Sequence, residues 1–144
     1  MKMSVKLLTI TTLLSVTVLA GCKKDSGDST QNYRADCNGA SEAPPNSSTA
    51  TATFMGTYNS DTKTFSGTLT YTGITPTGWY IQRGTTTTNG SIVVSLGAIV
   101  SSPFNFSVTL DAAAEAELKS GGYYINVQSV AYPSGEIRGK LVAQ

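Results

Sequence analysis

The amino-acid sequence predicts an all-β fold, and three features lead to that expectation. Charged residues make up only 13% of the 144 residues, a low share for a globular protein. Thr, Ser and Gly occupy many positions, which is typical of short strands joined by turns. Several segments alternate apolar with polar residues, and this is the period of a strand that buries one face.

We expect about seven or eight antiparallel strands, enough for two packed sheets. The segments with strand-like alternation are residues 33–38, 49–58, 63–71, 79–83, 92–96, 104–110, 121–130 and 135–142. One short helix is expected over residues 112–119, because Asp111 can cap it, Ala and Glu favour it, and Gly121 follows its end.

A C-terminal hairpin closes the predicted domain. Ile125 and Val127 alternate with polar residues on the first strand of this hairpin. The segment from Tyr132 to Gly135 favours a turn, because its proline presets one dihedral angle and its glycine tolerates positive φ. The returning strand then has Ile137 and Leu141 on its apolar side.

The first 21 residues have the features of an export signal. Lys2 and Lys6 give it a positive start, and residues 7–20 form an apolar stretch too short for a stable transmembrane helix. Residues 19–22, Leu-Ala-Gly-Cys, resemble a bacterial lipobox, which predicts cleavage before Cys22 and acylation of that cysteine. The alternative is an ordinary signal peptide that happens to end near a cysteine.

An acylated Cys22 predicts a protein held on a bacterial membrane, since each buried methylene contributes about 0.8 kcal/mol. Lys23 is not the aspartate that retains lipoproteins at an inner membrane, so the outer membrane is favoured, and the Lys-rich start resembles surface-export signals. Residues 22–32 are polar and predict a flexible tether. From Cys22 onward, eight basic residues face nine acidic ones, and this balance predicts no binding to nucleic acid.

Two motifs carry a resemblance to a known family. One has the form Gly-x-x-Glu-x-Pro-Pro, and the other joins an apolar-Asn-apolar step to a Tyr-Pro turn and a Gly-Glu-Ile-Arg-Gly close. The matching residues are Gly39, Glu42, Pro44, Pro45, Tyr124, Ile125 to Val127, Tyr132, Pro133 and Gly135 to Gly139. With these motifs in order, the chain resembles the CHRD domain family over residues 33–142, and we expect one domain at residues 33–144. The resemblance implies an immunoglobulin-like or superoxide-dismutase-like Greek-key sandwich, and the family has no agreed biochemical function.

The family pattern also contains histidines that this chain lacks. In the family, a His-apolar-His step and a further histidine resemble the copper ligands of superoxide-dismutase-like sandwiches. The corresponding residues here are Tyr80, Gln82 and Gln128, and the sequence contains no histidine at all. We therefore expect neither a bound metal nor another cofactor.

Five polar side chains are expected on the outward side of two strands, a set called here the polar strand face. They are Tyr80, Gln82, Tyr124, Asn126 and Gln128. The simpler interpretation is that they satisfy one another or water. The alternative is a recognition surface for a sugar or another small ligand, although strand alternation turns the neighbouring Trp79 into the core.

The other candidates for chemistry have structural interpretations. Cys37, the only cysteine after Cys22, falls on the apolar side of the first strand and is expected to be a buried, inert thiol. Glu42 is interpreted as an acceptor that fixes a turn. Glu136 and Arg138 are expected on one face of their strand, where each could form a structural ion pair across the hairpin or remain a solvated charge, since acid–base catalysis needs carboxylates in a cleft.

These expectations combine into a lipid-anchored cell-envelope protein that displays one β domain without catalytic activity. We expect it to act as an interaction or structural module with an extracellular protein or glycan as partner. The alternative is a carbohydrate or small-ligand binding protein that uses Tyr80, Gln82 and Gln128. An enzyme is not expected, because the sequence offers no histidine, one buried thiol and only scattered carboxylates.

Overall fold

The computed structural model describes residues 29–84, 87–98 and 101–144. Within this part of the chain the elements are β1 (Thr30–Asn38), η1 (Gly39–Ser41), β2 (Thr51–Asn59), β3 (Thr64–Thr72), β4 (Pro76–Arg83), β5 (Ile92–Gly97), β6 (Phe104–Thr109), α1 (Ala112–Lys119), β7 (Tyr123–Ser129), β8 (Ile137–Lys140) and β9 (Val142–Ala143). The expected signal and Cys22 lie outside the described residues. No helix in the described ranges is long and apolar enough to span a membrane.

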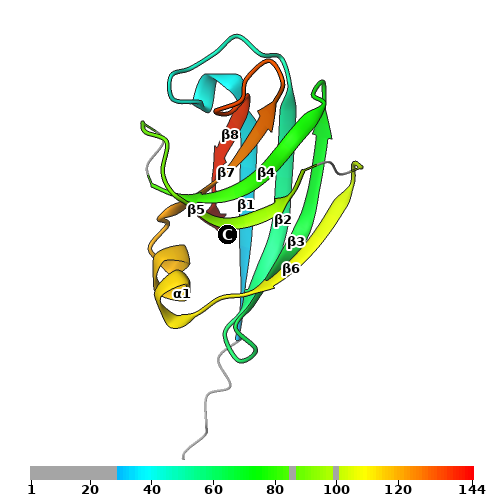
Figure 1. The fold of residues 1–144 in the computed structure, drawn as a ribbon. Helices are drawn as coiled ribbons and strands as arrows, with labels where there is room; N and C mark the ends of the chain where they lie inside the picture. Colours follow the sequence, from blue (N-terminus) through cyan, green and yellow to red (C-terminus); the bar gives the residue numbers. More distant parts are fainter. Residues whose placement is uncertain (1–28, 85–86, 99–100) are drawn as a thin grey trace, which may run out of the picture.

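The strands form one continuous antiparallel sheet in the order β5-β4-β7-β8-β1-β2-β3-β6, with β9 beside β1. The all-β class and the short helix are confirmed, but the expectation of two packed sheets is wrong. The reason is β8, which pairs with β7 on one side and β1 on the other and so joins the two halves. The twisted sheet then curls until it is nearly closed like a barrel, with β5 and β6 as its edges (Figure 1).

The hydrophobic core fills the inside of this curled sheet. Phe54 and Leu69 reach it from β2 and β3, and Trp79 and Ile81 reach it from β4; each of the four is no more than 2% exposed. Although β3 and β4 are not neighbours in the sheet, the rings of Tyr71 and Trp79 lie 5.3 Å apart. The predicted inward direction of Trp79 is therefore confirmed.

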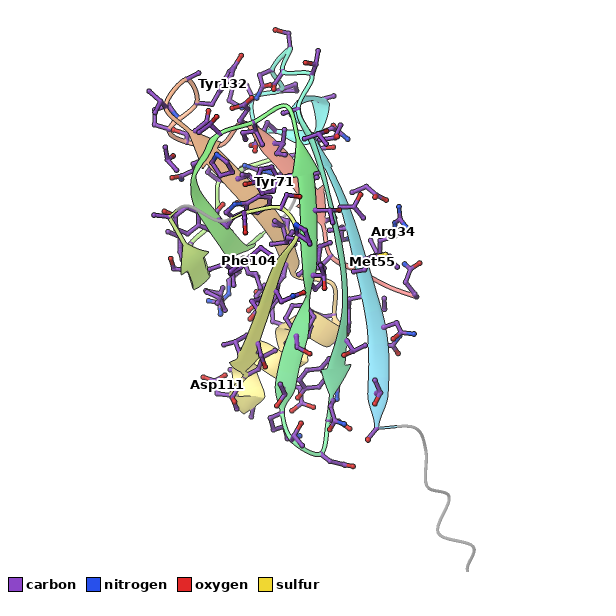
Figure 2. All side chains as sticks on the ribbon, turned by 90° about the vertical axis from the view of Figure 1, so that its right-hand side faces the viewer. Arg34, Met55, Tyr71, Phe104, Asp111 and Tyr132 are labelled. Atoms are coloured by element: carbon purple, nitrogen blue, oxygen red, sulfur yellow. The ribbon has the colours of Figure 1, made fainter. Side chains whose placement is uncertain are left out.

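The outward side of β1, β2 and β3 is polar. Thr51 lies opposite Thr72 and Thr53 opposite Thr70, as the alternation of the β2–β3 hairpin predicts. Figure 2 looks onto this side and shows β2, β3 and β6 across it. Met55 is the exception there, because it is an apolar residue and is 60% exposed.

The C-terminal hairpin has the predicted form. Residues Tyr124 to Val127 of β7 pair with Ile137 to Lys140 of β8. The turn is closed by a hydrogen bond of 3.1 Å that the Gly135 amide donates to the Tyr132 carbonyl. Gly135 has a φ of 143°, which a side chain would strain.

Helix α1 and the Tyr132 turn lie at different ends of the domain (Figure 2). The Asp111 carboxylate accepts a hydrogen bond of 2.8 Å from the Ala114 amide, which confirms the predicted cap. Figure 2 places Asp111 near one end of the molecule and Tyr132 at the other. Strand β1 begins at the end far from Tyr132 (Figures 1 and 2). It begins at Thr30, so residues 30–32, which were expected to belong to the tether, are part of the sheet.

Candidate functional site

A row of polar residues crosses β4, β7 and β8 on the side turned away from the core. Tyr80 lies opposite Asn126, and Asn126 lies opposite Arg138. Strand alternation places them there, because Ile81 and Ile137 beside them point inward. The row is nevertheless covered, since Asn126 and Arg138 are 0% exposed.

Arg138 is the centre of this covered region. Its Nη2 lies 3.0 Å from Oε2 of Glu42, and both side chains are almost fully buried. Its Nη1 donates to the Thr88 carbonyl at 3.1 Å, and its Nη2 also donates to Oδ1 of Asn89. The guanidinium carbon stands 4.3 Å from the centre of the Tyr124 ring, a cation–π geometry. We call Arg138, Glu42, Asn89, Tyr124 and Asn126 the Arg138 cluster.

Local structure after β1 brings Glu42 to Arg138. Asn38 ends β1 and caps η1, accepting from the Ser41 amide at 2.9 Å, so the chain turns over the end of β8. Asn46 then donates to the Glu136 carbonyl at 2.9 Å, and Ser48 donates to a Glu136 carboxylate oxygen at 2.6 Å. These bonds tie the Glu42 loop to the start of β8.

The remaining members of the cluster bind two further loops. Asn126 donates from Nδ2 to Oε1 of Gln82 at 2.9 Å and to the Ser134 carbonyl at 3.1 Å. The Tyr124 hydroxyl accepts a hydrogen bond of 2.8 Å from the Gly90 amide. Strands β4, β7 and β8 are thus linked through side chains to the loops that follow η1, β4 and β7.

The electrostatics of the Glu42–Arg138 pair contain two opposing effects. Burial raises the pKa of Glu42 above its ordinary value, while the Arg138 guanidinium favours the charged carboxylate. Oε2 is additionally approached by the Ala43 amide at 3.3 Å. Removing one partner of such a buried pair leaves a buried charge without compensation, which costs stability. The ion pair therefore helps to hold the Glu42 loop on the sheet.

Three of the five residues of the polar strand face are buried, although their side chains point away from the core as expected. Gln82, Tyr124 and Asn126 are no more than 6% exposed, because the loops of the Arg138 cluster cover them. Tyr80 and Gln128 are half-buried. Gln82 and Asn126 are hydrogen-bonded to each other, as the simpler interpretation expects, but Oδ1 of Asn126 has no partner among the described residues.

These residues do not fit the metal that the family's histidine pattern implies. At the corresponding positions stand the amides of Gln82 and Gln128 and the phenol of Tyr80, which are weak ligands for copper or zinc. Oε1 of Gln82 already accepts a hydrogen bond from Asn126. In the described ranges, no group of three or more His, Cys, Asp or Glu side chains is placed to hold a metal ion.

Cys37 has the predicted environment. Its side chain is 2% exposed and points to the core from β1. Burial raises the pKa of this thiol, and the neighbouring Asp36 and Glu42 carboxylates add to the shift. A thiolate is therefore disfavoured at neutral pH.

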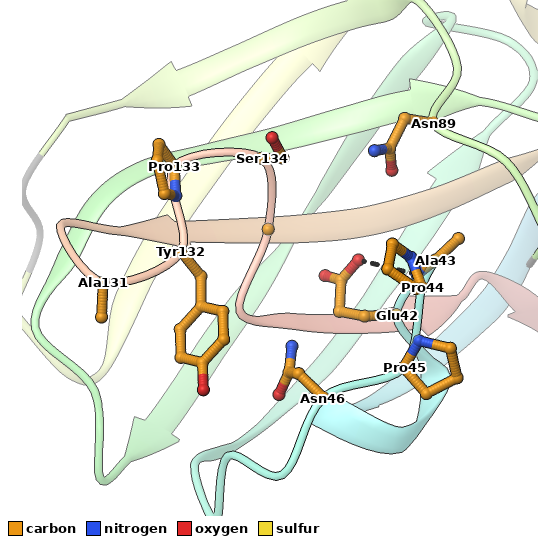
Figure 3. A pocket seen from close by; sticks show the side chains of 11 residues that line it. Glu42, Ala43, Pro44, Pro45, Asn46, Asn89, Ala131, Tyr132, Pro133 and Ser134 are labelled. Carbon is orange, nitrogen blue, oxygen red and sulfur yellow. Dashed lines mark hydrogen bonds between the residues drawn. The ribbon is translucent and has the colours of Figure 1, made fainter.

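A pocket of about 320 Å³ opens beside the Arg138 cluster, at the end of the domain where Tyr132 lies. Its lining consists of Glu42, Ala43, Pro44, Pro45, Asn46, Asn89, Ala131, Tyr132, Pro133, Ser134 and Gly135. In the view of Figure 3 the Glu42 carboxylate lies between Tyr132 and Pro44. We call this cavity the Glu42 pocket.

Both motifs that form the walls of the Glu42 pocket fall within a recognised family region. The CHRD domain family model matches residues 33–141, most of the chain. The protein belongs to the CHRD domain family. Neither a curated protein nor a solved structure matches it. In this CHRD domain, the Glu-x-Pro-Pro element and the Tyr-Pro turn form opposite walls of one pocket.

The pairing of Glu42 with Arg138 and the hydrogen bond from Arg138 to Asn89 were not predicted from the sequence. Because successive side chains of a strand point to opposite faces, and Ile137 points to the core, Arg138 could be predicted to point away from the core. Its burial depends on loops from distant parts of the chain, and no local pattern reports their position. The one available signal was Arg138 itself, a charged residue inside an expected strand of a protein with few charged residues. A charged side chain is rarely buried unless it is paired.

Proposed function

We propose that the protein is a cell-envelope lipoprotein, anchored by acylation of Cys22, whose CHRD domain is a binding or structural module without catalytic activity. The lipobox-like residues 19–22 support the anchor, and Lys23 favours the outer membrane, with exposure at the cell surface. Partners are the membrane and an extracellular protein or glycan. A net charge of −1 after Cys22 offers nothing for nucleic acid.

The observation that best supports a binding or structural module is the position of the Arg138 cluster. Its charged side chains are used to fix loops to the sheet, with the Arg138–Glu42 pair at 3.0 Å in a buried setting. Loops held in this way form a pre-organised surface, which lowers the entropy lost on binding. The same loops lie at the end of the domain away from the start of β1, so the tether leaves them free to meet a partner.

The proposal that the domain is not an enzyme rests on what its reactive groups already do. Glu42 is paired with Arg138, and the Cys37 thiol is buried with a raised pKa. The sequence contains no histidine that could serve as a general base. These groups support a structural interpretation of the cluster.

The anchor is tested by comparing wild type with Cys22→Ser in cells fed labelled palmitate. We expect wild type to take up label and to sediment with membranes, and the variant to remain unlabelled. A matched Cys37→Ser variant, which alters the other cysteine, should be labelled as wild type is. A wild-type protein without label that is recovered in the soluble fraction contradicts the proposal.

A second candidate function, binding of a carbohydrate or another small ligand, is favoured by the Glu42 pocket. From the sequence, this function was expected to use Tyr80, Gln82 and Gln128. With Gln82 buried, that set offers only two accessible side chains. The pocket has both polar and apolar walls, as small-ligand sites do.

A further inference from the structure

One carboxylate oxygen in the Glu42 pocket lacks a partner. Glu42 is 4% exposed, and its Oε2 is used by Arg138, whereas its Oε1 has no hydrogen-bond partner among the described residues. A buried, charged acceptor left unpaired costs free energy, so such an atom calls for a donor. Within the described residues Nε of Arg138 is a buried donor that also lacks a partner, since the ion pair uses Nη2. Because Glu42 lines the pocket, a molecule in the pocket can supply that donor.

Gly135 packs directly against this oxygen. A Cβ on Gly135 would lie 2.6 Å from Oε1 of Glu42 and 2.5 Å from Oδ1 of Asn126, too close for any side chain. The Asn126 oxygen is also without a partner in the described part of the chain. Two acceptors without donors therefore lie against the same glycine, which is part of the pocket lining.

The charge of Glu42 decides which kind of donor fits. Arg138 already compensates the carboxylate at 3.0 Å. A cationic ligand would bring a second positive charge close to a guanidinium inside a poorly solvated region, where like charges repel strongly. A neutral hydroxyl adds no charge, and its hydrogen bond to a carboxylate is among the stronger ones.

The walls of the pocket are apolar on two sides. Pro44 and Pro45 form one wall, and Tyr132 with Pro133 forms the other. A volume of about 320 Å³ is at the lower end for small-molecule sites. A small ring with a hydroxylated edge and an apolar face matches this combination, because its C–H groups can pack on the tyrosine ring.

We propose that the Glu42 pocket binds a neutral sugar unit of a glycan, with one hydroxyl donating to Oε1 of Glu42 and the apolar face of the ring packed against Tyr132. The inference rests on the proposed function as a binding module and names its ligand class. It also moves the carbohydrate site away from the outward side of β4, where Tyr80 lies.

The test uses the detergent-solubilised full-length protein on an array of neutral, acidic and amino glycans, followed by calorimetry with the best binder. We expect binding to neutral glycans. Tyr132→Ala should weaken it about tenfold through the lost ring contact. Tyr80→Ala is the matched control, a half-buried tyrosine outside the pocket, and should change affinity less than twofold; melting curves verify that both variants fold.

Four results would overturn the inference: no glycan bound by wild type, binding only to amino glycans, affinity unchanged by Tyr132→Ala, or affinity lost with Tyr80→Ala. A crystal structure of wild type with the best binder gives an answer that needs no variant. It should show a sugar hydroxyl on Oε1 of Glu42, whereas a water molecule or Nε of Arg138 alone on that oxygen contradicts the proposal. Failure here leaves the Cys22 anchor intact, since palmitate labelling tests that separately.

Discussion

Arg138 of β8 and Glu42 of the loop after η1 form a buried ion pair with a nitrogen–oxygen distance of 3.0 Å. The two residues belong to the two separate motifs of the CHRD domain, and their contact joins the N-terminal motif to the C-terminal hairpin. Since the loop that contains Thr88 and Asn89 also accepts hydrogen bonds from Arg138, this one side chain joins three segments: the Glu42 loop, the Thr88 loop and β8.

Arg138→Met is expected to destabilise the protein by about 3–5 kcal/mol, because it leaves the Glu42 carboxylate buried without its partner. Adding Glu42→Gln to this variant removes the uncompensated charge. The double variant should therefore lose less stability than the sum of the two single losses, and urea denaturation of the four proteins measures the difference. Additive losses would mean that the pair is not coupled.

Stability should fall in acid through Glu115 of α1. Hydrogen bonds from Lys119 and Lys63 lower the pKa of Glu115 from 4.5 to about 2. A lowered pKa in the folded state stabilises the fold above the unfolded pKa, and this contribution is lost as the pH falls from 4.5 through about 2. Denaturation curves between pH 6 and pH 2 should be less pH-dependent for Glu115→Gln than for wild type. Equal dependence in the two proteins would contradict this origin.

Cys37 should resist thiol reagents in the folded protein and react once it is unfolded, since its raised pKa and burial disfavour the thiolate. The measurement is the rate of reaction with a chromogenic disulfide in buffer and in denaturant. Cys37→Ala should cost about 1 kcal/mol, as expected for a small buried side chain. Rapid reaction of the native protein at neutral pH would show that the thiol is accessible.

Metal removal should leave the protein unchanged. A metal that binds only the folded state raises its stability, so a chelator would lower the melting temperature of a metalloprotein. With Tyr80, Gln82 and Gln128 at the family's histidine positions, we expect the same melting temperature with and without chelator. Stoichiometric copper or zinc in elemental analysis, together with a chelator-sensitive melting curve, would refute the expectation.

Much of the fold could be predicted from the sequence because its signals are local. The alternation in β2 and β3, the Asp111 cap of α1 and the Tyr132 to Gly135 turn each depend on neighbouring residues. The closure of the sheet does not. It depends on β8 pairing with β1, a contact between distant segments such as Asn38 and Arg138 that no local period encodes.

The candidate site shows the same division between local and distant information. Alternation correctly placed Tyr80, Gln82 and Asn126 away from the core, since the direction of a side chain follows from strand geometry. Their burial followed from loops packed over the strands, which bring Asn89 and Ser134 to the cluster. The pocket beside Glu42 could not be predicted, because its two walls come from motifs that are far apart in the sequence.

The central claim of the proposed function is that acylation of Cys22 anchors the CHRD domain to the membrane. Mass spectrometry of the N-terminal peptide from membrane-purified protein tests it most directly. The account predicts a peptide that begins at Cys22 and carries acyl chains on both the sulfur and the amine. A peptide that begins at another residue, or an unmodified Cys22, would contradict it.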